Sequence, residues 1–140
     1  MRAAPDASAP VVAVLPPPQG DIGVEMHVTG SSHGWFQIDH AGFQDYPGEA
    51  SPKEVFKGKG WVSGALIGFE VNNMDITDGP GQNAKRIAKL LAGPNGPDSF
   101  AVHRVLDCSG DKAEVEGNFA GRNLRGWVGG ICSNQVTTCP

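Results

Sequence analysis

The chain has little of what marks membrane, nucleic-acid-binding or metal-rich proteins. It contains three cysteines, and aromatic residues make up only 7% of its 140 residues. No apolar run approaches the roughly 20 residues that cross a bilayer, so we expect no membrane insertion. Its 11 basic residues are outnumbered by 15 acidic ones. A net charge of −4 does not favour nucleic acid, whose phosphates attract a cationic surface.

Glycine and proline, by contrast, are abundant, with 20 and 11 residues. The chain has no low-complexity run that would make this a sign of disorder, so we interpret the enrichment as frequent turns between short strands. Polar and apolar residues alternate over residues 24–28, 36–39, 100–106 and 113–116. This period of two is typical of half-buried strands and predicts an all-β protein.

The order of these segments occurs twice. Residues 12–15 match 87–90, residues 28–32 match 105–109, residues 35–38 match 112–115, and residues 60–62 match 126–128. A repeated order of apolar segments indicates a duplicated supersecondary unit. Ile38 and Trp61 are 23 positions apart and Val115 and Trp127 are 12 apart, so the first copy carries an 11-residue insertion. We therefore expect two small modules, joined near residues 71–73.

Residues 84–91 present a conflict between local and repeated patterns. Their composition favours a two-turn amphipathic helix that would end at Gly93. Their counterpart in the first copy, residues 11–15, has the composition of a strand. Because short helices are marginal without packing, we predict a strand here as well.

Several of these segments resemble the bacterial SH3-like (SH3b) family. The resemblance is carried by residues 2–15 (RAAPDASAPVVAVL), 34–38 (GWFQI) and 59–66 (KGWVSGAL), and more weakly by the second copy. It implies two small SH3-like antiparallel barrels in tandem, packed against each other, in an exported bacterial protein of the kind found beside cell-wall enzymes. The first barrel would span 1–71 with an inserted loop at 41–58, and the second, degenerate barrel would span 74–140. The second copy departs from the family at Lys112, where the family has tryptophan.

The cysteines give information about the cellular compartment in which the protein is expected to function. A disulfide between Cys132 and Cys139 would tie down a C-terminal tail that has no strand or helix period. Cys108 could compete for either partner, and three unpaired thiols in a cytosolic protein are the alternative. With the disulfide, a periplasmic or extracellular location is expected, with a signal peptide already removed. The histidines have no ligand spacing, so we predict no metal site and no cofactor.

The aromatic residues supply the candidate binding groups. Trp61 and Trp127 are predicted to fill the barrels, whereas Trp35, just after a turn, is open to either surface or core use. The aromatics of the insertion could line a groove or simply cap the first barrel. The predicted groove combines three aromatic and three acidic residues: Trp35, Phe43, Tyr46, Asp39, Asp45 and Glu49.

We predict no catalysis. Cys108 and His103 are the only close nucleophile–base pair, and residues five apart on one strand do not converge. The expected function is a binding module whose partner is a peptidoglycan peptide or another protein. The alternatives are a structural adaptor or inhibitor that uses both barrels as one rigid surface and, less favoured, a fragment of an enzyme.

Overall fold

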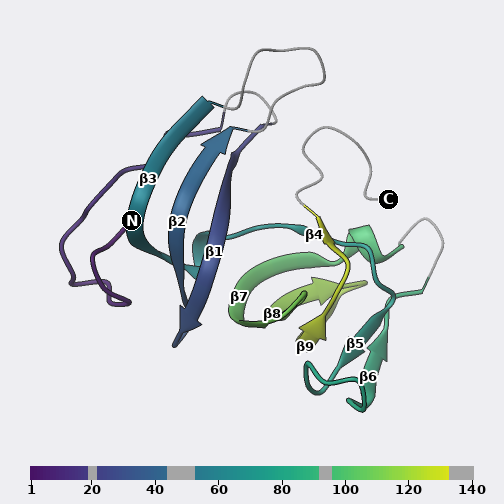
Figure 1. Cartoon of the computed structure of the whole chain (residues 1–140). Helices are drawn as coiled ribbons and strands as arrows, with labels where there is room; N and C mark the ends of the chain where they lie inside the picture. Colours follow the sequence, from purple (N-terminus) through teal and green to yellow (C-terminus); the bar gives the residue numbers. More distant parts are fainter. Residues whose placement is uncertain (19–21, 44–52, 92–95, 133–140) are drawn as a thin grey trace. The chain divides into compact units, whose positions relative to one another are not determined.

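The computed structural model describes residues 1–18, 22–43, 53–91 and 96–132 (Figure 1). These residues form β-strands and two single-turn 3-10 helices, η1(Gly64–Leu66) and η2(Pro97–Ser99), and contain no α-helix. None of the helices in this part of the chain is long and apolar enough to cross a membrane. The prediction of an all-β protein is confirmed.

The described chain divides into two compact units, residues 1–63 and 64–132, called here the first unit and the second unit. The division lies before the expected linker at residues 71–73. The reason is that β4(Glu70–Val71) pairs with β10(Ile131–Cys132), so Val71 opposes Ile131 and belongs to the second unit. Its side chain is fully buried.

The first unit is an antiparallel sheet of β1(Val24–Ser32), β2(Trp35–Phe43) and β3(Lys53–Ser63), in that order. The N-terminal residues extend it, because the backbones of Arg2 and Trp61 exchange two hydrogen bonds of 2.8 Å. The predicted inserted loop at 41–58 is shorter than expected, since residues 41–43 continue β2 and residues 53–58 belong to β3. The core is apolar, formed by Phe36, Ile38, Ala41, Phe43 and Val62.

The second unit is a five-stranded antiparallel sheet in the order β6-β5-β9-β8-β7. Its strands are β5(Asp75–Thr77), β6(Arg86–Lys89), β7(Ala101–Ser109), β8(Lys112–Phe119) and β9(Arg122–Val128). Its buried side chains are Val71, Ile76, Leu90, Phe100, Val105, Ala113, Val115 and Val128. The described strands of neither unit close into a barrel.

The strand predicted at residues 84–91 is confirmed as β6. It pairs with β5, and the Leu90 N–H donates to the Met74 carbonyl over 2.6 Å. Leu90 has no exposed surface. Pairing and burial together outweigh the helix propensity of this segment, which a short isolated helix could not realise in water.

Near the hairpin turn and the Gly-Trp-Val motif, the strands of both units pair in the same register. Trp61 lies opposite Gln37 in the first unit, and Trp127 lies opposite Glu114 in the second. The first hairpins match too, with Ser32 opposite Trp35 and Ser109 opposite Lys112. Each unit shifts register at the equivalent place, between Val28 and Gly30 and between Val105 and Asp107. Three of the four repeated pairs of segments therefore occupy equivalent places in the two sheets. The fourth pair does not, because residues 87–89 lie in β6 whereas residues 12–15, whose composition predicted a strand, belong to no strand. In that stretch only Val11 forms an isolated bridge, with Arg2.

The shared Gly-Trp-Val motif has a packing reason. A Cβ on Gly126 would lie 2.8 Å from the backbone oxygen of Thr77 and 2.9 Å from the Cδ1 methyl of Ile87. A Cβ on Gly60 would meet Val12, the repeat partner of Ile87, at 3.3 Å. In the second unit β6 lies close over this glycine, and in the first unit the side chains of Met1 and Val12, which belong to no strand, cover the equivalent position. A side chain at either glycine would therefore meet a neighbouring segment.

Candidate ligand-binding face of the first unit

The side chains of β2 separate onto two faces. Phe36 and Ile38 are buried, whereas Trp35 and Gln37 are half-buried and Asp39 is exposed. Successive strand residues point to opposite sides of a sheet, so these last three share one face. Trp61 lies directly opposite Gln37 and presents its side chain on that face. We call this surface, made by Thr29, Trp35, Gln37, Asp39 and Trp61, the Trp35–Trp61 face.

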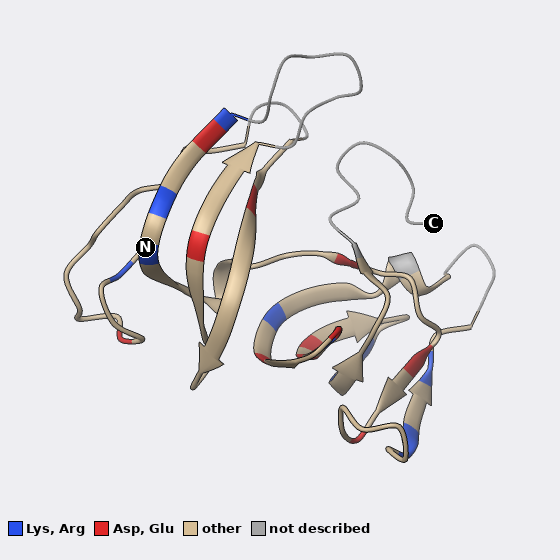
Figure 2. Cartoon of the chain, viewed as in Figure 1, with Lys and Arg blue, Asp and Glu red and all other residues tan. Residues whose placement is uncertain are grey.

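Polar contacts order this face. The Thr29 hydroxyl lies 3.3 Å from both the backbone carbonyl oxygen and the side-chain oxygen of Gln37. The Oδ1 atom of Asp39 lies 2.7 Å from Nδ1 of His27 on the neighbouring strand. Asp39 remains 54% exposed, so its carboxylate is accessible to a ligand as well as to the histidine. Basic residues on β3 give this unit both signs of charge (Figure 2).

The prediction that Trp61 and Trp127 fill the two cores is wrong. Both side chains are half-buried, and neither belongs to the buried set of its unit. In each Gly-Trp-Val motif the valine points inward, Val62 being 7% exposed and Val128 fully buried. Alternation then directs the tryptophan to the opposite face of the sheet. The two tryptophans are therefore surface features of their sheets.

Phe43 does not belong to the predicted groove. Its side chain is only 8% exposed and packs in the core. Between Ile38 and His40 the pairing of β2 with β3 shifts register, which marks a β-bulge. A bulge inserts one residue and reverses the inside–outside alternation beyond it, so Phe43 points away from the side that carries Trp35. The remaining predicted groove residues, Tyr46, Asp45 and Glu49, lie outside the described residues.

The predicted disulfide cannot be described, because Cys139 and the side chain of Cys132 lie outside the described part of the chain. The backbone of Cys132 is described and pairs with Glu70. Cys108 is a half-buried free thiol on β7, opposite Ala113. It is therefore not engaged as a competing partner.

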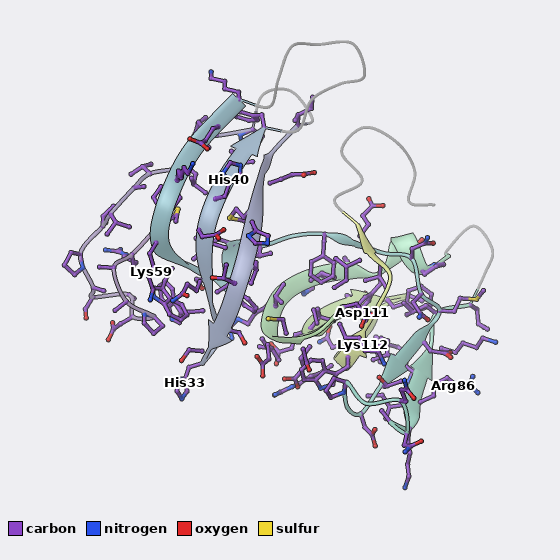
Figure 3. The ribbon with its side chains drawn as sticks, viewed as in Figure 1. His33, His40, Lys59, Arg86, Asp111 and Lys112 are labelled. Atoms are coloured by element: carbon purple, nitrogen blue, oxygen red, sulfur yellow. The ribbon has the colours of Figure 1, made fainter. Side chains whose placement is uncertain are left out.

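The equivalent face of the second unit is chemically different. Lys112 takes the place of Trp35, as Figure 3 shows at the start of β8, and Glu114 takes the place of Gln37. The Arg125 Nε–H donates to Oε1 of Glu114 over 2.9 Å, and Arg125 Nη1 lies 3.9 Å from Oε1 of Glu116. The hydrogen bond to Glu114 and the charges of both carboxylates raise the pKa of Arg125. The charged groups beside Trp127 are thus paired with one another.

Sequence reasoning missed Thr29, Gln37 and Trp61 as members of one surface. The alternation of residues 35–38 was visible, but it did not show which of the two sides faced the core. Across the described residues no group of three or more His, Cys, Asp or Glu side chains is arranged to hold a metal ion.

No family model matches the chain, and no curated protein or solved structure is significantly similar to it.

Proposed function

We propose that the chain is a tandem SH3-like, non-catalytic binding module of an exported protein, and that it recognises a cell-wall peptide or a protein partner through the Trp35–Trp61 face. The supporting observation is that this face places two tryptophans beside an exposed carboxylate on one rigid sheet. Flat aromatic side chains supply large contact areas at low entropic cost, which suits recognition of an extended peptide.

The chemistry of the face favours a ligand with both apolar and cationic groups. Trp35 and Trp61 can stack against aliphatic or backbone surface, and Asp39 can accept a hydrogen bond from an ammonium group. Gln37 lies beside Trp61 and offers amide donors and acceptors to a peptide backbone. This pattern suits the amine-bearing peptides of peptidoglycan, and it equally suits a basic segment of a protein.

The second unit is not expected to bind the same ligand. At the position of Trp35 it has Lys112, so the stacking surface is reduced to Trp127. Its carboxylates already hold Arg125, at 2.9 Å and 3.9 Å. A ligand amine would have to displace this arginine, which lowers the net gain from binding.

The equivalent positions of the two units allow a matched test. Purified peptidoglycan and its soluble peptide fragments would be titrated with the wild-type chain, Trp35→Ala and Lys112→Ala. We expect Trp35→Ala to weaken binding by about tenfold or more, as the loss of an aromatic anchor does. Lys112→Ala should bind like the wild type. Trp61→Ala and Trp127→Ala form a second pair with the same expected asymmetry.

Stability measurements on the same variants separate this proposal from the adaptor alternative. If Trp35→Ala lowers the free energy of unfolding and leaves ligand binding unchanged, the tryptophan is structural and the adaptor or inhibitor role is favoured. If no variant and no wild-type protein is retained by peptidoglycan, the cell-wall form of the proposal fails.

A further inference from the structure

Two exposed histidines occupy opposed positions on neighbouring strands of the first unit. His27 on β1 and His40 on β2 are directly opposed in the sheet register. Their side chains are 69% and 47% exposed. Directly opposed residues of antiparallel strands have Cα atoms about 4.5–5.5 Å apart and side chains on the same face. Figure 3 shows His40 well along β2, away from His33 at the tip of the hairpin.

Each imidazole has one nitrogen beside a carboxylate. Nδ1 of His27 lies 2.7 Å from Oδ1 of Asp39, and Nδ1 of His40 lies 3.3 Å from Oε2 of Glu54. An ionised carboxylate only accepts hydrogen bonds, so Nδ1 is the protonated nitrogen when the ring is neutral. The lone pair is then on Nε2 of each ring. Metal-binding histidines characteristically have this arrangement, in which a carboxylate holds the ring nitrogen that does not bind the metal.

We propose that His27 and His40 together bind one divalent transition-metal ion through their Nε2 atoms. Neutral imidazole suits Zn²⁺, Ni²⁺ and Cu²⁺, with the strongest binding expected for Cu²⁺. The carboxylates of Asp39 and Glu54 are orienting groups and not ligands. Water completes the coordination, so the ion exchanges readily.

Charged side chains around the two histidines alter the electrostatic attraction of this site for a metal cation. Lys57 on β3 is paired with His40 along the edge of β2 that does not face β1, and its positive charge repels a cation. Asp39 and Glu54 offset that charge, and both are about half exposed. Because the site is exposed to solvent, the free-energy cost of desolvating the ion is small. The same solvent screens the electrostatic attraction between the ion and the carboxylates. We therefore expect the opposed positions of the two imidazoles, more than the local charge, to provide the binding.

Calorimetry with Ni²⁺ at pH 7.5 would test the site on the full chain, with cysteines alkylated so that thiols do not compete for the metal. We expect one Ni²⁺ per chain. His27→Gln and His40→Gln should each weaken binding by about 100-fold, since one imidazole loses the advantage of two linked ligands. Asp39→Asn should weaken it by about tenfold.

His103→Gln is the matched control, because His103 is exposed on β7 of the second unit. It should bind Ni²⁺ like the wild type. Circular dichroism would verify that each variant is folded, and Cu²⁺ added below stoichiometry should broaden the amide NMR signals around His27 and His40 first. The proposal is overturned if either glutamine variant binds Ni²⁺ as tightly as the wild type, if the wild type binds none, or if the broadening centres elsewhere.

Discussion

The two units share a strand register but carry different surfaces. Gln37 and Glu114 occupy the same position opposite a tryptophan, yet Gln37 bonds to a threonine and Glu114 to an arginine. Both units keep a glycine that a neighbouring segment approaches closely and an inward valine after the tryptophan. Packing thus constrains one side of each sheet tightly, while the other side is free to differ. Two sheets can in this way share a pattern of strand pairing and present two chemistries.

The largest expected difference between the units is in the loss of unfolding free energy when their equivalent glycines are replaced by alanine. In Gly126→Ala the new methyl group would meet the fixed backbone oxygen of Thr77 at 2.8 Å, and we expect a loss of about 2–3 kcal/mol in the free energy of unfolding. In Gly60→Ala the nearest atom is the flexible end of the Met1 side chain, so about 1 kcal/mol is expected. Urea denaturation measures both values, and equal losses would contradict the distinction.

A smaller effect is expected at two hairpin turns that are not equivalent, the β1–β2 turn of the first unit and the β8–β9 turn of the second, each of which has a non-glycine residue at positive φ. His33 has φ 52° in the first unit and Ala120 has φ 49° in the second. Alanine is strained in this region, so Ala120→Gly should raise the melting temperature and stabilise by about 0.5–1 kcal/mol. Histidine tolerates the region better, so His33→Gly should gain less. Destabilisation by Ala120→Gly would show that the turn is not strained.

The smallest effect concerns the N-terminal loop of the first unit. Oδ1 of Asp6 accepts hydrogen bonds from the backbone N–H of Ser8 at 2.7 Å and from its hydroxyl at 2.8 Å. These bonds lower the pKa of Asp6 from 3.8, the backbone bond contributing most. Because the folded-state pKa is depressed, the stabilisation is present above the unfolded pKa and is lost as pH falls through the folded pKa.

Ser8→Ala therefore should move the pKa of Asp6 part of the way back toward its ordinary value, since the backbone bond remains. An NMR titration of the carboxyl carbon measures this shift. The corresponding stretch of the second unit has a carboxylate of its own, Asp78, whose Oδ1 accepts a hydrogen bond from the backbone N–H of Lys85 over 2.8 Å. The same substitution should therefore leave the acid titration of the second unit unaltered, and a change there would indicate that the loop acts beyond its own unit.

Much of the strand order was predictable because alternation and repetition are local properties of the chain. The strand within residues 84–91 illustrates this only in part. Its repeat partner, residues 11–15, indicated a strand where composition indicated a helix, yet residues 12–15 form no strand themselves. The candidate site was predictable only in part. Trp35 and Asp39 lie on one face of the sheet, as expected. Phe43 lies on the opposite face, because the register shift before His40 reverses the alternation of side chains. No residue pattern between Ile38 and Phe43 signals that bulge.

The sequence by itself determined the succession of strands, the turns between them and the doubling of the pattern, because these depend on neighbours along the chain. Only the tertiary structure decided which side of each sheet is covered, and so that Trp61 and Trp127 lie opposite the core. It also decided that β4 belongs to the second unit, through the pairing of Val71 with Ile131. The physical reason is the same in each case: a period of two defines two faces, and only contacts between distant segments choose which one is buried.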